Sequence, residues 1–344
     1  MNVGVHCFDD EYIIERINKL GQIGNCDFTG KIDVQVASIE IIKGLMSDFI
    51  SLIETDDKAT NVDLLTIEQL NKEYNFLSEE LKVYEFDKLL ETLFGKGFSQ
   101  TTKIKFKYDL LSSFELHKES QQWEEFSNRI KYVRRFFGDF FELNKFESLF
   151  EFFTKKIEKG EILYRGRVNQ SDDKLSDEEM KMPPKNFARG GRANPDGIAY
   201  LYLAKEKETT IHEIRSNLYD SLTIAHFKAQ SNIQVLDLSQ VKKVSPFRSS
   251  ASIAEFLENR PFLEKLEYEL RKPIRKNDLP IEYLPTQYFC EYVRSLDMFD
   301  GIVYGSAMHK GGKNIVLFNA NKVEIIKTEK IEIENIKYTF TQVN

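Results

Sequence analysis

Cysteine is scarce in this chain of 344 residues, which contains only Cys7, Cys26 and Cys290. Three scattered thiols are too few for a disulfide framework, so the sequence predicts a reducing compartment, with the cytoplasm as the default. Long apolar runs are missing too, and the N-terminal residues carry acids where a secretory signal needs basic and then apolar residues. We therefore expect no insertion into a membrane.

An excess of positive charge is also absent. Lys and Arg number 48 against 55 Asp and Glu, which gives a formal net charge of −7. Binding to nucleic acid along the whole chain is not expected, because phosphate contacts need clustered Lys and Arg. The chain has neither a G-x-x-x-x-G-K-[ST] loop nor a G-x-G-x-x-G turn after a predicted strand. The sequence therefore does not predict a nucleic-acid-binding surface along the chain or either of these phosphate-binding loops, but it is compatible with a local basic pocket.

The pattern of apolar residues changes near residue 160, which predicts two kinds of structure. From about residue 60 to residue 159, apolar residues return at steps of three and four, as in helices, and Gly160 is expected to cap the last of them. Farther on, short runs rich in Val, Ile, Tyr and Phe are bounded by turn residues, which is typical of strands. The runs predicted as strands are 162–168, 198–204, 222–229, 233–238, 301–307 and 314–318.

Helices are expected between these strands, so the second half of the chain is predicted to be α+β. The predicted helices lie at about 209–219, 250–271 and 285–297. Residues 171–191 are too polar and too rich in Pro and Gly for regular structure, and we expect a loop over a site or a flexible insertion. The predicted domains are a small N-terminal segment at 1–55, a helical domain at 56–158 and an α+β domain at 159–344.

Three arginines are candidate ligands for an anion. Arg165 and Arg167 are two apart on the strand 162–168 and project to one face, where two guanidinium groups suit a diphosphate. Arg192 follows two glycines in a loop and precedes Asn194, a composition that lets the backbone approach a ligand closely. The alternatives are an edge strand with surface ion pairs and an ordinary surface turn.

Aromatic, acidic and hydroxyl residues complete the candidate set. Tyr200 and Tyr202 share one face of a strand, where a phenol could stack on a nicotinamide or adenine ring or pack in the core. Glu213 is the candidate carboxylate, although the run from Thr210 to Glu213 also matches a helix capping box. Ser306, in a glycine-rich turn between two strands, could hydrogen-bond a ribose or an amide, or be only a turn residue.

An arginine, a tyrosine and one carboxylate suit the loss of nicotinamide from NAD⁺. The nicotinamide is already a cationic leaving group, so no general acid is needed, unlike the two-carboxylate scheme of ordinary glycosidases. The carboxylate would stabilise charge on the ribose, arginines would hold the diphosphate, and a tyrosine would hold the nicotinamide. NAD⁺ would then be a substrate, and no cofactor or metal is expected.

These residues, in this order, resemble the RES domain, a family named for its Arg, Glu and Ser. The resemblance covers about residues 160–325. It implies a fold similar to ADP-ribosyltransferases and an enzyme that degrades NAD⁺ by hydrolysis or phosphorolysis, as the toxin of a toxin–antitoxin pair. The resemblance assigns catalytic roles to Arg165, Arg192, Tyr202, Glu213 and Ser306. The further candidates for substrate binding are Arg167, Asn194 and Tyr200.

The first part of the chain is similar to the HEPN-type helical domain that precedes RES in some bacterial proteins. This implies a regulatory, oligomeric or partner-binding role. Relatives of that kind begin with a paired CxxC zinc-ribbon pattern, but Gly4 and Thr29 stand here where partners of Cys7 and Cys26 would be. Because His6 lies directly beside Cys7, it is not expected to replace them, and we expect two buried thiols without a metal.

The expected function is therefore degradation of NAD⁺ by a cytoplasmic enzyme. Such an activity is toxic, so we expect a cognate antitoxin or a trigger such as phage infection, and homo-oligomers are compatible with the sequence. Two alternatives stay open. One is transfer of ADP-ribose to a macromolecule, and the other is a non-catalytic partner-binding module in which Glu213 only caps its helix.

Overall fold

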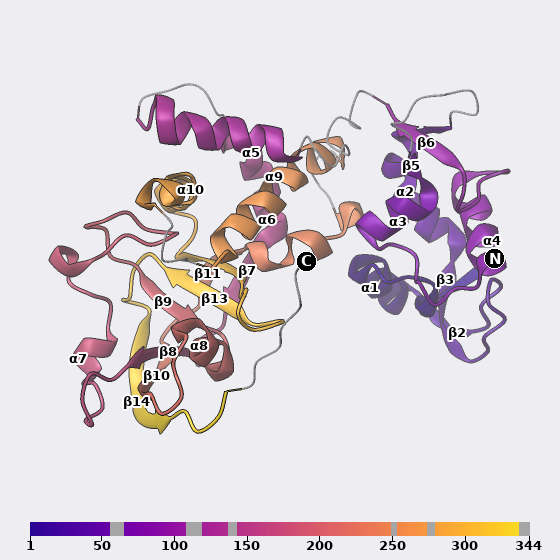
Figure 1. Ribbon diagram of the computed structural model, residues 1–344. Coiled ribbons are helices and arrows are strands. Elements are labelled where there is room, and N and C mark those ends of the chain that lie inside the picture. Colours follow the sequence, from indigo (N-terminus) through magenta and orange to yellow (C-terminus); the bar gives the residue numbers. More distant parts are fainter. Residues whose placement is uncertain (56–64, 108–118, 137–142, 249–252, 274–278, 337–344) are drawn as a thin grey trace, which may run out of the picture. The chain divides into compact units, whose positions relative to one another are not determined.

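The computed structural model describes residues 1–55, 65–107, 119–136, 143–248, 253–273 and 279–336. The chain divides into two compact units, which can be followed along the sequence by colour in Figure 1. The first unit consists of residues 1–122 and 242–262, and the second of residues 123–241 and 263–344. Helix α9, Ile253–Arg271, contributes residues to both. The predicted boundaries at residues 55 and 158 fall inside these units, and the three predicted domains stay a prediction.

The first unit combines helices with two small antiparallel sheets. The sheets have the strand orders β1-β3-β2 and β4-β6-β5. Their strands are β1 (Asn2–Gly4), β2 (Gln22–Gly24), β3 (Val34–Ser38), β4 (Ile53–Thr55), β5 (Leu65–Thr66) and β6 (Lys103–Phe106). The helices are α1 (Glu11–Leu20), α2 (Ile39–Ser51), α3 (Ile67–Tyr74) and α4 (Val83–Phe94). Strands β5 and β6 correct the prediction of an all-helical region, since strands this short leave almost no periodicity.

The core of the first unit is aromatic. The ring of Phe49, on α2, lies edge to face against Tyr74, Phe76 and Phe106. Phe247, from the second chain segment of this unit, packs against Phe49 at 5.3 Å between ring centroids. Edge-to-face pairs add to the free energy of burying the rings. Segment 242–262 is thus built into the core that residues 1–122 supply.

The second unit is built on an eight-stranded sheet with the order β14-β10-β8-β9-β13-β12-β11-β7 (Figure 1). Neighbouring strands are antiparallel except for the parallel pair β11 and β12. The strands are β7 (Thr154–Ile157), β8 (Ile162–Val168), β9 (Leu201–Ala204), β10 (Ser221–Ala229), β11 (Ile233–Asp237), β12 (Gly301–Gly305), β13 (Lys313–Leu317) and β14 (Val323–Glu332). All six predicted strands are present, and the predicted α+β class is confirmed.

Two strands at the edges of this sheet were not predicted. The residues of β7 were expected to form the end of a helix, with Gly160 as the C-cap of that helix. Instead they form a strand, and Gly160 lies in the turn between β7 and β8 with φ of 95°. Strand β14 mixes charged and apolar residues without a regular alternation and pairs only with β10. Edge strands often carry charged side chains because one edge of the strand is not paired and faces solvent. A search for apolar runs therefore misses them.

The helices of the second unit are short. They are α5 (Glu119–Asn128), which begins in the first unit, α6 (Glu147–Phe153), α7 (Asp177–Met180), α8 (Lys207–Ile214) and α10 (Leu284–Ser295). Helices α8, α9 and α10 confirm the three predicted helices. The predicted loop 171–191 is irregular apart from α7 and one 3₁₀ turn. Within the described residues, no helix has both the length and the apolar character needed to cross a bilayer.

Candidate active site

A pocket of about 340 Å³ opens in the middle of the large sheet. It is lined by Tyr164, Arg165, Gly166, Tyr202, Leu203, Ala204, Thr210, Glu213, Ile214, Tyr304 and Asn314. Strands β8 and β9 are paired only through Tyr164 and Ala204, and both of these residues line the pocket. Three of the five predicted catalytic residues, Arg165, Tyr202 and Glu213, are therefore brought together here, although they are up to 48 positions apart in the sequence.

A glycine on β8 allows helix α8 to form one wall of the pocket. A Cβ atom on Gly166 would lie 2.3 Å from Cδ1 of Ile214 and 2.7 Å from Cγ2 of Thr210, both on α8. Such distances are below any normal contact between carbon atoms. The hydroxyl of Thr210 also donates a hydrogen bond to the carbonyl oxygen of Tyr164 at 3.2 Å. Close approach of helix and strand places Glu213 at the pocket.

Arg165 brings a positive charge that the described residues do not neutralise. Its Nη1 atom is buried and has no hydrogen-bond partner within the described part of the chain. Burial, together with the nearby charge of Arg167, lowers the pKa of Arg165 to about 10. The group is still charged at neutral pH. A buried guanidinium without a partner is costly unless an anion binds it.

Glu213 is held by two hydrogen bonds to one of its carboxylate oxygens. Ser306 Oγ donates to Oε1 at 2.6 Å, and Asn314 Nδ2 donates to the same atom at 2.8 Å. Ser306 is itself fixed, because its Oγ accepts from the backbone N–H groups of Met308 and His309. Oε2 has no hydrogen-bond partner among the described residues, so one oxygen is anchored and the other is available at an exposed position.

The capping interpretation of Glu213 is wrong. Helix α8 begins at Lys207, with Glu206 as its N-cap, so Thr210 and Glu213 lie within the helix and not at its start. The hydroxyl of Thr210 bonds to strand β8, and the carboxylate of Glu213 bonds to Ser306 and Asn314. The capping-box spacing alone could not reveal that the helix starts four residues earlier, with Glu206 and not Thr210 as its N-cap.

Tyr202 is oriented by the loop that precedes its strand. Its hydroxyl donates to Oδ1 of Asn194 at 2.5 Å, and burial raises the pKa of this phenol well above its usual range, so it stays neutral. Asn194 is buried, and its Nδ2 atom donates to the backbone carbonyls of Arg189 and Ile198. Asn194 therefore positions Tyr202 and shapes the loop, and it does not line the pocket.

Arg192 does not line the pocket either. Its side chain is buried, with the guanidinium 4.8 Å from the ring centroid of Tyr283 and Nη2 donating to the carbonyl of Pro273 at 3.2 Å. Its own carbonyl accepts a hydrogen bond from Thr286 at 2.6 Å. Burial raises the pKa of the pocket residue Tyr304, and the positive charge of Arg192 is close enough to oppose this rise in part. In this structure it contacts Pro273, Tyr283 and Thr286, none of which lines the pocket.

Two further candidates lie away from the pocket. Arg167 was expected to share the face and the environment of Arg165, but it is exposed, and its Nη1 atom donates to the carbonyl of Glu179 at 2.7 Å. Tyr200 was expected beside Tyr202, but it precedes β9 and is buried, with its ring 5.1 Å from that of Phe318. Neither residue is in the lining of the pocket.

Asn314 and Tyr304 are pocket residues that the sequence did not reveal. They are direct partners in the β12–β13 pair, and both line the pocket. A polar residue at the start of the apolar run 314–318 was the available signal for Asn314. Its importance depends on the pairing of strands that are far from α8 in sequence, which spacing within one motif does not show.

The pocket combines a partly buried cation, a neutral phenol and one anchored carboxylate. Among the residues that the structure describes, Glu213 is the one acidic residue in the lining, so this lining does not offer the several anionic ligands of a metal centre. Its volume lies at the lower end of the range for small-molecule sites, which suits the reacting end of a dinucleotide with the remainder extending outward. Such a pocket can bind an anion and stabilise positive charge a short distance away.

Comparisons with known proteins give a family and include a solved structure. Residues 164–341 match the RES domain family. No curated protein matches the chain. The M. tuberculosis MbcT–MbcA toxin–antitoxin complex contains a chain that is 18% identical, with a TM-score of 0.31, where the similarity covers 54% of this chain and 92% of that one. The family match spans more than half of the 344 residues, and this chain therefore belongs to the RES domain family.

Proposed function

We propose that this protein cleaves the bond between nicotinamide and ribose in NAD⁺. The observation that carries the proposal is the shared pocket of Arg165 and Glu213. The buried Nη1 atom of Arg165 has no hydrogen-bond partner among the described residues, and the carboxylate of Glu213 has one anchored oxygen. The first is suited to the diphosphate of a dinucleotide. The second is suited to a sugar that becomes positively charged.

In the proposed reaction the C–N bond to C1′ of the ribose breaks, and its electron pair leaves with the ring nitrogen, which makes nicotinamide neutral. Positive charge develops on C1′ and the ring oxygen of the ribose. Glu213 stabilises this charge, while Ser306 and Asn314 hold its Oε1 atom in place. Water then bonds to C1′ and loses a proton, which gives ADP-ribose. If phosphate attacks instead, the product is the 1-phosphate of ADP-ribose.

Tyr202 and Arg165 have binding roles in this proposal. The neutral phenol of Tyr202 offers an aromatic face to the nicotinamide, and the hydrogen bond to Asn194 fixes its hydroxyl. Arg165 gains its missing partner when the diphosphate binds, so substrate binding relieves a cost that the free protein carries. Arg192, behind the pocket, keeps the loop in position through its backbone and its contact with Tyr283.

The test is incubation of the full chain with NAD⁺, with and without phosphate, followed by chromatography of the products. Nicotinamide release is expected in both cases, and a product that appears only with phosphate identifies phosphorolysis. Glu213→Gln keeps the acceptor for Ser306 and Asn314 but removes the charge, and should lower kcat by about 100-fold or more. Glu208→Gln, an exposed carboxylate on the same helix, is the matched control and should behave like wild type.

Two results would contradict the proposal. The first is intact NAD⁺ with both wild type and Glu213→Gln. The second is radiolabelled ADP-ribose bound covalently to protein or nucleic acid at the rate of nicotinamide release, which would favour transfer to a macromolecule.

For the cell, we propose a toxin that a partner protein restrains or a trigger releases. Equal growth of cells that express wild type and Glu213→Gln would remove that role.

A further inference from the structure

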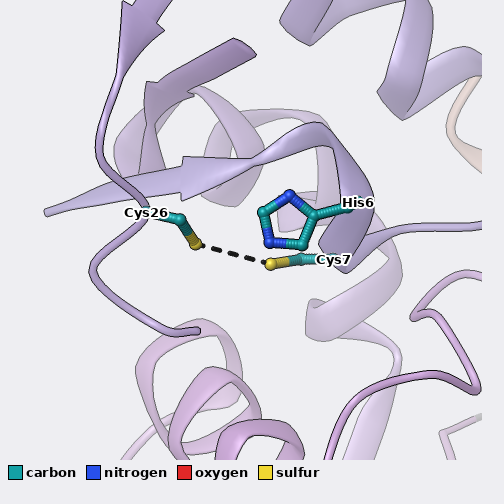
Figure 2. Close-up of side chains that lie close together, drawn as sticks. All are labelled: His6, Cys7 and Cys26. Atoms are coloured by element: carbon teal, nitrogen blue, oxygen red, sulfur yellow. Dashed lines mark hydrogen bonds between the residues drawn. The ribbon is translucent and has the colours of Figure 1, made fainter. Parts of the chain in front are cut away.

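A second group of reactive side chains lies in the first unit, separate from the pocket. His6 and Cys7 belong to the 3₁₀ turn Val5–Cys7 that follows β1, and Cys26 lies in the loop between β2 and β3 (Figure 2). One ligand atom from each, a ring nitrogen and two sulfurs, lies within 4.8 Å of the other two. Cys7 and Cys26 are 0% and 2% exposed, and His6 is half-buried.

The distance between the two sulfurs is 3.7 Å, and Figure 2 shows them facing each other. A disulfide would need about 2.05 Å. Two thiolates on one tetrahedral zinc ion, each about 2.3 Å from the metal, are about 3.8 Å apart. The observed separation therefore matches the edge of a tetrahedral site without any movement of the backbone.

A glycine makes room for the imidazole. A Cβ atom on Gly4 would lie 2.4 Å from Cε1 of His6 and 3.3 Å from Cβ of Cys26, so the His6 ring occupies the space that a side chain at position 4 would fill. Gly4 has φ of −82°, which any residue adopts, so the need for glycine here is one of space. Although His6 and Cys7 are neighbours in the sequence, the tight turn and Gly4 bring both side chains to one point.

The surroundings hold these groups in place. The backbone N–H of Gly4 donates to Sγ of Cys26 at 3.3 Å, and Nε2 of His6 is 2.7 Å from the hydroxyl oxygen of Thr29. Two hydrogen bonds tie the loop that carries Cys26 to β1. The backbone N–H of Asp27 donates to the carbonyl of Asn2, and the backbone N–H of Asn2 donates to the carboxylate of Asp27. Hydrogen bonds to thiolate sulfurs and fixed ligand positions are what a metal site requires around its ligands.

We propose that His6, Cys7 and Cys26 bind one zinc ion. Two thiolates balance the charge of a divalent cation, so the buried complex with a neutral imidazole carries no net charge. Two sulfurs and one imidazole nitrogen select a thiophilic ion over magnesium or calcium. The fourth position belongs to a water molecule or to the Thr29 hydroxyl. The ion joins β1 to the β2–β3 loop and stabilises a sheet whose strands are only three to five residues long.

The test is metal analysis of the full chain after purification without chelator. About one zinc per chain is expected. Replacing zinc by Co²⁺ should give the thiolate-to-metal absorption of a site with two sulfurs. Cys7→Ser and Cys26→Ser should each abolish stoichiometric binding, and His6→Gln should weaken it by at least tenfold. Cys290→Ser removes a buried thiol of the second unit and should leave the zinc content unchanged.

A measurement on the wild type guards against variants that fail to fold. Removal of zinc by a chelator should lower the thermal midpoint, and added Zn²⁺ should restore it while Mg²⁺ should not. Gly4→Ala, which keeps all three ligands but takes the space of the imidazole, should also reduce zinc affinity. Less than about a tenth of a zinc per chain, unchanged binding in the two Ser variants, or a mass that shows a Cys7–Cys26 disulfide would each overturn the proposal.

Discussion

Replacing Arg165 by Met is expected to make the free protein more stable and to abolish the proposed cleavage of NAD⁺. The pKa of Arg165 falls from the ordinary value of an arginine to about 10. This fall means that folding disfavours the charged guanidinium relative to the neutral one by a free energy of about 3 kcal/mol. Met keeps the length and the apolar stem but removes the buried charge. We therefore expect the free energy of unfolding to rise by about 1–3 kcal/mol at neutral pH, because the uncompensated guanidinium is gone.

The assay is urea denaturation followed by tryptophan fluorescence. The chain has a single tryptophan, Trp123, which is 4% exposed in the second unit, so its emission reports the unfolding of the unit that contains the pocket. Arg167→Met is the matched control, since Arg167 is exposed, and it should change stability by less than about 0.5 kcal/mol. Pyrophosphate should raise the midpoint of the wild type and of Arg167→Met but leave that of Arg165→Met unchanged.

The pH dependence of this difference has a definite sign. Because the pKa of Arg165 is lower in the folded than in the unfolded chain, the unfolded chain binds more protons between the two values. Wild-type stability then rises with pH in that interval, and the gap to Arg165→Met narrows above about pH 10. A variant less stable than wild type would refute the reasoning, since it would mean that the guanidinium already has its compensating partner.

Three further predictions concern neighbouring parts of the second unit. Gly166→Ala should cost about 1–3 kcal/mol and reduce NAD⁺ cleavage, because its methyl group meets Ile214 and Thr210, and unchanged values in urea denaturation and product analysis would contradict this. Ser306→Ala should lower kcat by about 10- to 100-fold with little change in KM, since it frees Oε1 of Glu213, and an effect on KM alone would contradict this positioning role. Glu329→Gln should lower the thermal midpoint slightly at neutral pH, because hydrogen bonds from Lys207, Lys327 and His226 hold the pKa of Glu329 well below its usual range. The folded pKa is the lower one, so this difference should fade as the solution is acidified through the carboxylate range, and a constant difference would count against the linkage.

The central strands were readable from sequence because they are buried and therefore rich in apolar residues. Strands β8 to β13 follow this pattern, whereas β7 and β14, at the edges, carry lysine and glutamate and were missed. The very short strands of the first unit were missed for a different reason, since two to five residues cannot establish a period.

The candidate site was predicted in part, and the limit has a physical cause. Arg165, Tyr202 and Glu213 stand out because charged and phenolic groups near apolar runs are costly without a ligand. Whether a side chain lines the pocket depends on packing between segments that are distant in sequence. For this reason the sequence could not show that Arg165 lines the pocket while Arg192 packs on Tyr283. The place of Asn314 in the pocket comes from strand pairing, and the proposed role of His6 depends on the absence of a side chain at Gly4.

The first unit is discontinuous in sequence, and this limits how the protein can be shortened. Residues 242–262 are an insertion between two parts of the second unit, yet Phe247 is buried against Phe49 and Phe76, and Arg260 forms an ion pair with Glu73. Deleting residues 1–122 would expose the ring of Phe247 to water and remove Glu73, the ion-pair partner of Arg260. A truncated RES region should therefore be prone to aggregate unless 242–262 is removed with the N-terminal residues.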